Sequence, residues 1–488
     1  MYFQRIYDEK LAQAAYLIGC QKTGQAAIID PERDVDRYIR IAEENGLRIT
    51  AITETHIHAD FLSGARELAE KTGAALYLSG EGGEDWKYNW LGSKNDGGFY
   101  THTLLEDGDS FNVGNVEIRA VHTPGHTPEH LSFLVYDHGG GADDPIGIAT
   151  GDFVFVGDVG RPDLLETAAG QEGTKEPAAH VLHDSLRWFD KLDDYLQVWP
   201  GHGAGSACGK ALSAIPMTTV GYEKRFNGAI SSSRGNADAF VKFILDGQPD
   251  PPYYFARVKQ ENRDGVELLG ELPKPELTAP SNVASALTSG DGVFLDTRSW
   301  SAFRQSHLRS SYHTPFNKSF PTIAGSYVEP DQDVYIVIGH DQVEEAVCDL
   351  VRVGVDHIKG YILPEALEQY LNEGGDKGEV VSTTVEGLAA ILREKDVTVL
   401  DVRGESEYRA GHVRGALQLA HTRLPAGTNN LPDNEPLYVH CKNGARSAVA
   451  TAYLQAHGKD IIYVSGTFDD LAKAGVPIAA SPKEGAVA

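Results

Sequence analysis

Cysteine is scarce in this sequence, and it has no long apolar run. The four cysteines of the 488-residue chain lie far apart, which does not fit a scaffold held together by disulfide bonds. We therefore expect a cytoplasmic protein in which a reactive cysteine acts as a free thiol. No run approaches the roughly 20 apolar residues that a membrane-spanning helix needs, so we expect no membrane association.

Positive charge is also in short supply. The chain has 43 Lys and Arg against 70 Asp and Glu, which gives a formal net charge of -27 at pH 7. Because so acidic a surface repels phosphate backbones, we expect no nucleic-acid partner. The first 20 residues lack a basic region followed by an apolar core, so we expect no signal peptide.

The remaining composition is that of a globular protein, with 41% hydrophobic and 23% charged residues. At roughly 150 residues for each domain, the length suggests about three domains. We expect an N-terminal domain over residues 1–250, a linker over 251–280, and two smaller domains over 281–376 and 380–480. The linker is predicted from two stretches rich in turn-forming residues, "LDGQPDPPYYFARV" and "LPKPELTAPSNV".

The N-terminal half alternates apolar strands with amphipathic helices, which predicts a layered α/β domain. The predicted helices cover residues 34–46, 63–73 and 180–192. The predicted strands cover residues 26–30, 48–55, 116–123, 130–137, 146–152 and 195–203.

The C-terminal half contains an internal duplication. The stretch "GVFLDTRSWSAFRQSHLRSSYH" (292–313) matches "VTVLDVRGESEYRAGHVRGALQ" (397–418) in its apolar strand, Asp-x-Arg, short helix and histidine. Each copy continues into a second strand and helix, at 333–354 and 436–458. An α/β unit of roughly 100 residues therefore occurs twice.

Four motifs rich in histidine and aspartate lie at the ends of predicted strands of the first half. They are "THIHADF" (55–61), "HTPGHTPEH" (122–130), "TGD" (150–152) and "PGHG" (200–203). Ligands converge at strand ends in layered α/β folds, and histidine with carboxylate suits zinc or iron. After Asp60 this chain has the apolar ring of Phe61, which cannot bind a metal ion.

In this order, the four motifs resemble the metallo-β-lactamase fold, an αββα sandwich with metal at one edge, over residues 1–245. Paired-metal hydrolases of this fold, such as glyoxalase II, have the complete His-x-His-x-Asp-His motif. The persulfide dioxygenases of the same superfamily use a single Fe(II). Their pattern implies His56, His126 and Asp152 as ligands of one iron per chain, with open positions for substrate and O₂.

The same resemblance implies roles around the iron. His58, Asp60 and His202 would orient the ligands through hydrogen bonds. Arg161, in "GDVGRPDL" (157–164), could bind a carboxylate or phosphate of the thiol substrate, or form a surface salt bridge. Cys208 lies in a glycine-rich loop just before a predicted helix, and we expect its thiol to be exposed. It either receives or relays sulfur near the iron or is incidental.

A second constellation, "HCKNGARS" (440–447), follows an apolar strand and opens a helix. The N–H groups of such a loop attract negative charge and favour a thiolate at Cys441, and Arg446 adds positive charge. The loop is one residue shorter than the Cys-x5-Arg loop of tyrosine phosphatases, which suits a persulfide better than a phosphate. With "LDVRGESEYRAGHVRGA" upstream, the unit resembles a rhodanese, whose cysteine carries a sulfane sulfur.

The first copy of the duplicated unit departs from this pattern. A gapless alignment puts Gly339 opposite Cys441 and Glu344 opposite Arg446. The nucleophile and its cationic partner are both missing, so we expect this copy to be inactive.

Together, the resemblances imply a multidomain α/β protein in which a metallo-β-lactamase sandwich precedes two rhodanese-like, doubly wound α/β domains. They imply sulfide detoxification: O₂ oxidises a low-molecular-weight thiol persulfide to sulfite and thiol, and Cys441 passes sulfane sulfur to sulfite to give thiosulfate. The carrier thiol, whether glutathione, coenzyme A or similar, stays open, as does a homo-oligomeric state. The alternatives are a dinuclear-zinc, glyoxalase II-like thioester hydrolase fused to a sulfurtransferase, and a non-catalytic sulfur carrier or sensor.

Overall fold

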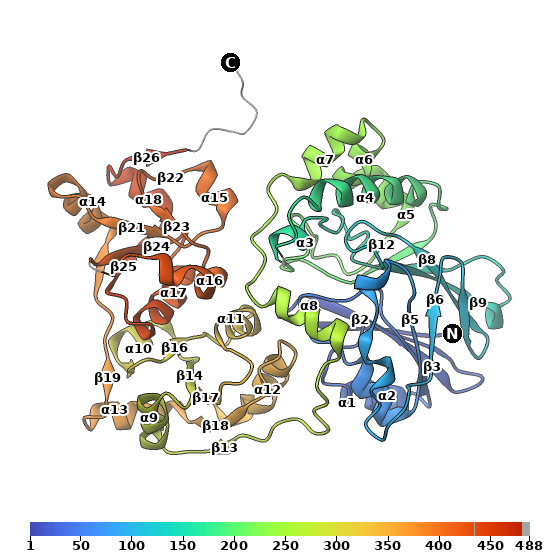
Figure 1. Ribbon diagram of the computed structural model, residues 1–488, viewed down its shortest axis with the longest axis horizontal. Coiled ribbons are helices and arrows are strands. Elements are labelled where there is room, and N and C mark those ends of the chain that lie inside the picture. Colours follow the sequence, from blue (N-terminus) through green and yellow to red (C-terminus); the bar gives the residue numbers. More distant parts are fainter. Residues whose placement is uncertain (169, 434, 481–488) are drawn as a thin grey trace. The chain divides into compact units, whose positions relative to one another are not determined.

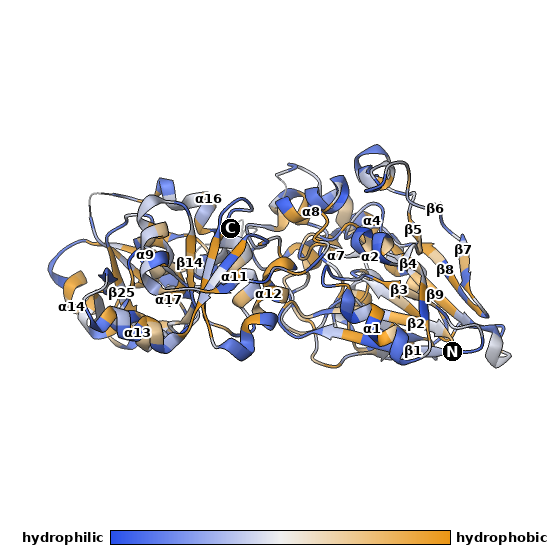
Figure 2. Ribbon diagram, turned by 90° about the horizontal axis from the view of Figure 1, so that it is seen from below, coloured by the Kyte–Doolittle hydropathy of each residue, from blue (hydrophilic) through white to orange (hydrophobic). Residues whose placement is uncertain are grey.

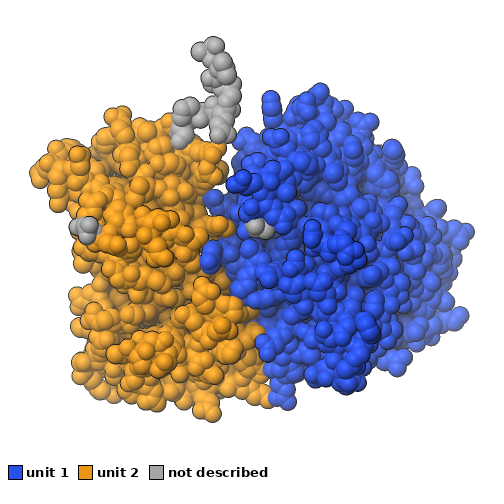
Figure 3. Space-filling view, viewed as in Figure 1, with its two compact units in different colours: residues 1–271, 351–353 blue, residues 272–350, 354–488 orange. Residues whose placement is uncertain are grey.

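The computed structural model describes residues 1–168, 170–433 and 435–480. It divides into two compact units, which Figure 3 shows in different colours. Unit 1 comprises Met1–Glu271 and Val351–Val353, and unit 2 comprises Leu272–Leu350 and Gly354–Ala488. Among the described residues, no helix is both long and apolar enough to cross a membrane.

Two β-sheets form the centre of unit 1 (Figure 1). Within the described residues, each sheet has six strands. The first runs in the order β1 (Tyr2–Asp8), β2 (Gln13–Cys20), β3 (Gln25–Ile29), β4 (Arg48–Thr53), β5 (Ala75–Ser79), β6 (His102–Leu105). The second runs in the order β12 (Thr218–Thr219), β11 (Gln197–Pro200), β10 (Gly147–Gly151), β9 (Leu131–Asp137), β8 (Val116–His122), β7 (Ser110–Val113).

An apolar core lies between these sheets, and helices cover their outer faces. Tyr16 and Ile18 of the first sheet share a core with Phe133 and Val135 of the second. The opposite face of the first sheet packs on α1 (Asp36–Glu44) and α2 (Ala65–Thr72). That of the second packs on α4 (Lys175–Phe189), α6 (Gly228–Ser233) and α7 (Ala237–Leu245). The layers are therefore helix, sheet, sheet, helix, and the hydropathy colours of Figure 2 follow the apolar strands and polar helix surfaces.

Unit 1 extends beyond the predicted N-terminal domain. Residues 251–271 were predicted to be part of a linker, but they belong to unit 1 and contain helix α8 (Phe255–Asp264). Phe255 and Val258 of this helix are buried, although the turn residues just before it suggested a solvated connection. The local composition therefore missed a helix that lies close to the site described below.

Unit 2 contains two five-stranded parallel sheets with the same strand order, among the described residues. The first follows β13 (Glu276–Leu277), β18 (Ile358–Ile362), β17 (Val334–Val337), β14 (Val293–Asp296), β16 (Tyr312–His313). The second follows β20 (Ser382–Thr384), β25 (Ile461–Ser465), β24 (Leu437–His440), β21 (Thr398–Asp401), β23 (Leu417–Gln418). The internal duplication inferred from the sequence is thus a duplication of topology.

Strand pairing corrects the gapless alignment of the two copies by one residue. Asp296 pairs with Val337 in the first copy, as Asp401 pairs with His440 in the second. The residue that follows is Ile338 in one copy and Cys441 in the other, so Ile338 rather than Gly339 occupies the position of the cysteine. The connection to the next helix is longer by one residue in the first copy, 338–342 against 441–444, which the alignment could not detect.

Candidate functional site

Six buried side chains gather at one edge of the unit 1 sandwich. They form two groups, in each of which the possible ligand atoms lie within 4.8 Å of one another. The first group is His56, His126 and Asp152, and the second is Asp60, His202 and Cys208. His202 joins the groups, because its Nε2 is 3.1 Å from Asp60 Oδ2 and 3.4 Å from Asp152 Oδ1. The structure therefore brings together all three predicted metal ligands.

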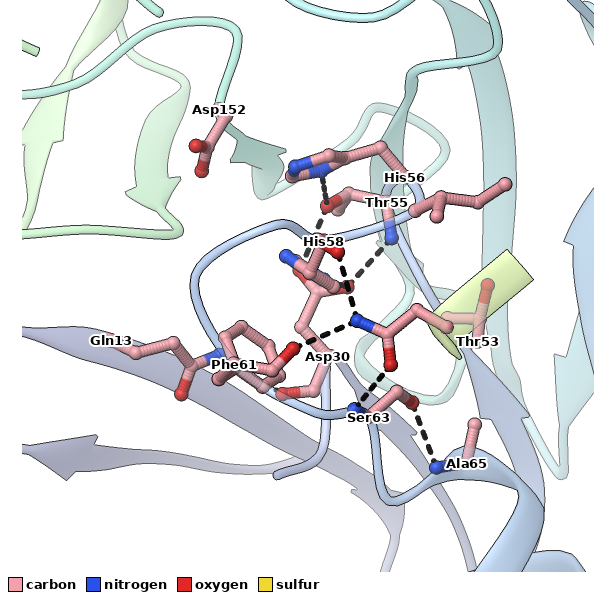
Figure 4. A network of polar contacts seen from close by, with 12 residues as sticks. Gln13, Asp30, Thr53, Thr55, His56, His58, Phe61, Ser63, Ala65 and Asp152 are labelled. Atoms are coloured by element: carbon pink, nitrogen blue, oxygen red, sulfur yellow. Dashed lines mark hydrogen bonds and ion pairs between the residues drawn. The ribbon is translucent and has the colours of Figure 1, made fainter. Parts of the chain in front are cut away.

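Hydrogen bonds define the tautomers of the two histidines in the first group. The Thr55 hydroxyl donates to Asp30 Oδ2 at 2.9 Å, so it accepts from His56 Nδ1 at 3.0 Å (Figure 4). His126 Nδ1 donates to the Arg161 carbonyl at 2.8 Å. Both rings thus keep the Nε2 lone pair. Burial, with neighbouring histidines, holds the pKa of His56 well below its ordinary value, and burial also lowers the pKa of His126.

The surroundings of the Asp152 carboxylate show whether these residues fit a metal ion. Asp152 is fully buried, and neither carboxylate oxygen makes a hydrogen bond within the described residues. The nearest nitrogens, His202 Nε2 and His126 Nε2, lie 3.4 and 3.5 Å away without forming hydrogen bonds. Burying a carboxylate that makes no hydrogen bond is costly, and a cation would satisfy it. Two neutral imidazoles and one carboxylate match the ligand set of non-haem iron sites and are also compatible with zinc. The residues therefore fit a metal ion.

His58 lies outside both groups. Its Nε2 is 3.1 Å from Asp30 Oδ1, and its ring packs on Phe61 with the centroids 4.3 Å apart. Burial lowers the pKa of His58, but the Asp30 and Asp60 carboxylates outweigh it and raise the pKa to about 9. The apolar Phe61 ring, fully buried, occupies space beside the site.

Two residues with strained backbones hold this region together. Ala12 and Asp30 have φ of 54° and 53°, a left-handed conformation that few non-glycine residues adopt. The Ala12 carbonyl accepts from His202 Nδ1 at 3.1 Å, and the Asp30 carboxylate accepts from the Thr55 N–H at 2.6 Å. Neither residue was singled out in the sequence. Ala12 acts through its backbone and carries no signal in the sequence, whereas Asp30 is the last residue of a predicted strand, and the motifs also lie at strand ends.

His130 is a further residue of the site that was not among the predicted site residues. Its Nε2 accepts the backbone N–H of Asp152 at 3.1 Å, and its Nδ1 lies 2.9 Å from the Thr123 hydroxyl. Its ring also stacks on His56, with the centroids 5.1 Å apart. His130 therefore touches two of the three predicted ligands. It is the last histidine of "HTPGHTPEH", which was a sufficient signal to find it.

Arg161 does not present its guanidinium to solvent. The side chain is 1% exposed and forms a two-point ion pair with Asp163, Nε to Oδ1 at 2.8 Å and Nη2 to Oδ2 at 2.6 Å. Nη1 donates to the carbonyls of Ala207 and Pro249. Because every guanidinium nitrogen is engaged in this way, the geometry offers no support for the predicted contact with substrate. It equally excludes the alternative of a surface salt bridge.

Cys208 is buried, and the expectation of an exposed thiol is wrong. Its side chain is 2% exposed, and Sγ belongs to the group with Asp60 and His202. Burial raises the pKa of the thiol to about 12, with the Asp152 and Asp60 carboxylates acting in the same direction. The helix expected just beyond it is also missing, because the next described helix is α5 (Val220–Phe226). Small neighbours did not expose the thiol, since the loop folds back onto the site.

The predicted sulfur-transfer loop lies in unit 2 between β24 and helix α17 (Ala445–Ala456). Cys441 is 2% exposed, and its Sγ accepts the Gly444 N–H at 3.2 Å and lies 3.4 Å from Ser447 Oγ. Gly444 has φ of 91°, and a Cβ there would meet the Tyr463 hydroxyl at 2.7 Å, so glycine is required. The loop thus turns the Gly444 N–H toward the sulfur, whereas the Ser447 hydroxyl donates to the Gly444 carbonyl.

Arg446, the predicted cationic partner of Cys441, is bound to another residue. Its Nη1 and Nη2 lie 2.5 and 2.9 Å from the two carboxylate oxygens of Glu407. Glu407 belongs to α15 (Glu405–Ala410), within the upstream stretch that carried the rhodanese resemblance. The positive charge beside the cysteine loop is therefore largely compensated, which the one-dimensional motif did not indicate.

The Asp-x-Arg element of each copy is an internal ion pair. In the second copy, Arg403 Nε and Nη2 bind Asp401 at 2.9 and 2.6 Å. In the first, Arg298 Nε and Nη2 bind Asp296 at 3.0 and 2.6 Å. The repeated motif is thus explained by the same buried contact at the end of the same strand.

Comparison with known proteins agrees with this architecture. The model of the Metallo-beta-lactamase superfamily matches residues 9–202, and that of the Rhodanese-like domain matches residues 384–474. The crystal structure of a metallo-beta-lactamase from Staphylococcus aureus subsp. aureus COL is 43% identical, with a TM-score of 0.67. That match covers 74% of this chain and 99% of the other.

Other relatives match somewhat more than half of the chain. The mitochondrial persulfide dioxygenase ETHE1 of Homo sapiens is 26% identical over 54% of this chain and 89% of its own length. Beta-lactamase hydrolase-like proteins of Xylella fastidiosa (strain 9a5c) and Agrobacterium fabrum are 27% and 32% identical. This chain spans 65% and 62% of their lengths, which is less than two thirds.

These matches define the class of protein. The chain belongs to the metallo-β-lactamase superfamily and carries a rhodanese-like domain in its C-terminal part. Its relatives include persulfide dioxygenases, and the predicted fold class is confirmed.

Proposed function

We propose that the protein oxidises a low-molecular-weight thiol persulfide with O₂ in unit 1 and transfers sulfane sulfur through Cys441 in unit 2. One observation carries the proposal. His56, His126 and Asp152 converge in a chain that has Phe61 where a paired-metal hydrolase has a further ligand. The similarity to persulfide dioxygenases and the rhodanese-like match support the same pair of activities.

The balanced oxidation is RSSH + O₂ + H₂O → RSH + SO₃²⁻ + 2 H⁺. One Fe(II) per chain, held by His56, His126 and Asp152, would supply open coordination positions for the persulfide sulfur and O₂. Thr55 and Arg161 hold the two imidazoles with Nε2 unprotonated, and His130 holds the backbone of Asp152. These contacts orient the ligands without taking part in the chemistry.

The residues around the ligands keep water and competing ions away. Phe61 is fully buried beside His58, and the Phe155 ring lies 6.0 Å from that of His202. His58, Asp60 and His202 are proposed to orient the ligands, since each pairs with a carboxylate or histidine within the site. Cys208 is proposed to receive or guide sulfur there, because its thiol belongs to the adjoining group.

Sulfur transfer proceeds by two exchanges at Cys441. The Cys441 thiolate attacks the outer sulfur of a second persulfide, the S–S bond breaks, and the carrier thiol leaves. Sulfite then attacks the outer sulfur of the enzyme persulfide, giving thiosulfate and regenerating the thiolate. The Gly444 N–H lies where it can hold negative charge on sulfur. Arg446 supports the anion only in part, because Glu407 compensates its charge.

Metal content and oxygen uptake test the proposal together. Protein purified without oxygen should contain one iron per chain and should consume one O₂ for each glutathione or coenzyme A persulfide that it oxidises. Two zinc ions per chain, with thioester hydrolysis and no oxygen uptake, would establish the glyoxalase II-like alternative. A chain with neither activity would be a sulfur carrier or sensor. Cytoplasmic location and a homo-oligomeric state stay predictions of the sequence.

A further inference from the structure

The segment that carries His56, His58 and Asp60 has little regular structure of its own. Between the end of β4 at Thr53 and the start of α2 at Ala65, it forms only an isolated bridge at Ser63 among the described residues. Most of it is nevertheless buried. Buried backbone N–H and C=O groups require partners, and here these come from backbone and side-chain groups of other segments.

One side chain supplies three of these partners. Asn262 Nδ2 donates to the carbonyls of His58 and Phe61, both at 2.8 Å, and Oδ1 accepts the Ser63 N–H at 2.8 Å. Figure 4 shows the segment from His58 to Ser63 with these contacts dashed. The amide has two N–H donors and one carbonyl oxygen, and all of them form hydrogen bonds to this segment. Asn262 is 3% exposed and lies on α8, some 200 residues along the chain.

A residue at the other end of α8 binds Asp60, which lies between His58 and Phe61 in the segment. The hydroxyl of Tyr254, which precedes α8 directly, donates to the Asp60 carbonyl at 2.9 Å. The helix backbone is anchored in turn, because Trp90 Nε1 donates to the Asn262 carbonyl at 3.2 Å. Tyr254 and Asn262 thus form hydrogen bonds to the segment at four positions, residues 58, 60, 61 and 63. We call these two side chains the α8 clamp.

The segment bound by the α8 clamp is connected to the proposed metal ligands through Asp60 and His202. Asp60 Oδ2 is 3.1 Å from His202 Nε2, and the same nitrogen is 3.4 Å from Asp152 Oδ1. A shift in the backbone of residues 58–63 would therefore move the Asp60 carboxylate, then the His202 ring, and then the group that faces Asp152.

We propose that Asn262 and Tyr254 are positioning residues of the metal centre, which set the affinity and ligand geometry of the bound ion through the segment 58–63. This inference rests on the proposed function only in requiring that the first group binds a divalent metal. It differs from a role in folding alone, in which the clamp would change the thermal stability of unit 1 and leave the metal as it was.

Metal binding by the full-length chain distinguishes the two roles. After removal of metal by a chelator, the protein is titrated with Fe(II) or Co(II) without oxygen, and the Co(II) absorption bands report ligand geometry. Asn262→Ala should weaken binding by about 10–100-fold, the usual effect of losing a residue that orients ligands, and should shift the bands. Asn262→Asp has the same size but turns an oxygen toward the His58 and Phe61 carbonyls. It should therefore fail to restore binding, whereas a role in packing alone predicts rescue.

Asn227 provides the matched control. It is fully buried, its Nδ2 donates to the Asp158 carbonyl and Glu223, and its Oδ1 accepts the N–H groups of Ala229 and Ile230. Asn227→Ala should lower the thermal midpoint as much as Asn262→Ala does, yet keep metal affinity within about twofold of the parent. Equal losses of affinity in both variants, or no loss in either, overturn the inference.

A milder variant covers the case in which Asn262→Ala does not fold. Tyr254→Phe removes one hydroxyl and one hydrogen bond, and it should shift the Co(II) bands and weaken binding by a few-fold. Unchanged bands and affinity in a folded Tyr254→Phe protein overturn the inference as well. Failure of the parent chain to bind Fe(II) or Co(II) would instead refute the proposed function, so the two failures are distinct.

Discussion

Glu407 and Arg446 form a two-point ion pair beside the loop of Cys441, with N–O distances of 2.5 and 2.9 Å. The arginine that the loop motif supplies is therefore not an unshared positive charge. Both side chains stay partly accessible, at 27% for Arg446 and 33% for Glu407. An approaching sulfite dianion meets a nearly neutral pair rather than a cation.

Neutralising Glu407 should therefore strengthen the attraction of sulfite. In Glu407→Gln, Arg446 keeps its charge without compensation, and a partly exposed charge contributes ~1 kcal/mol to binding an anion nearby. The KM for sulfite in thiosulfate formation should fall about fivefold at low salt, and the gain should fade at high ionic strength. Glu405→Gln, in the same helix but paired with Arg409, is the control. An unchanged or higher KM in Glu407→Gln would contradict the prediction.

The same pair predicts how stability depends on pH. Burial raises the pKa of Glu407, but the ion pair with Arg446 outweighs it and holds the pKa below its ordinary value. A carboxyl whose pKa is lower in the folded state stabilises that state above the unfolded pKa of about 4.3 and loses this contribution as the pH falls through the folded value. Parent and Glu407→Gln should thus differ in thermal midpoint by roughly 2–4 °C at most near pH 7, and by less below about pH 4.

Loss of one proposed ligand should remove the metal. His126→Ala leaves a single imidazole and the Asp152 carboxylate, which are too few to retain Fe(II) through purification. Iron content and persulfide-dependent oxygen uptake should both be lost. His122→Ala, in the same motif, is the control, because His122 is partly exposed and its Nε2 is bonded to the Pro128 carbonyl. Retention of a full iron equivalent in His126→Ala would show that the ion is bound elsewhere.

The spacing of motifs was sufficient to predict the convergence of His56, His126 and Asp152. Each lies one to four residues beyond the end of a strand, and the strand order of a layered fold brings those ends to one edge. The contacts that hold them there could not be predicted in this way. Asn262 reaches the segment of His58 from about 200 positions away, and turn-rich composition near it suggested a linker instead of a helix.

Burial was the other property that local sequence did not reveal. Glycines around Cys208 suggested an open loop, but tertiary packing places its thiol beside His202. Arg161 had the residue type for an anion site, yet Asp163 and two carbonyls from distant segments occupy its donors. In both cases the side chain was identified correctly as part of the region, and its accessibility depended on residues far along the chain.

The two proposed chemistries should be separable at Cys441. Cys441→Ser places a hydroxyl where sulfur must be carried, and an alcohol does not form the persulfide at neutral pH. Oxygen uptake with glutathione persulfide should stay at the level of the parent, while sulfite accumulates in place of thiosulfate. Cys348→Ser, in α12 (Val343–Val351) of the first copy, should leave the products unchanged. Undiminished enzymatic thiosulfate formation by Cys441→Ser would show that sulfur reaches sulfite by another route.

The last prediction concerns the role of the buried thiol of Cys208. Its Sγ lies in one group with Asp60 and His202, next to the proposed iron ligands but outside their set. If the thiol receives or guides the persulfide sulfur, Cys208→Ser should lose oxygen uptake at matched iron loading, because the hydroxyl cannot exchange sulfur. Iron content should stay near one per chain, since His56, His126 and Asp152 are untouched. Cys20→Ser, at the buried end of β2, is the matched control and should behave as the parent. Unchanged uptake in Cys208→Ser would make the thiol incidental. Loss of iron would mean that the ion is held by the group of Asp60, His202 and Cys208, and the assignment of the ligands would have to be revised.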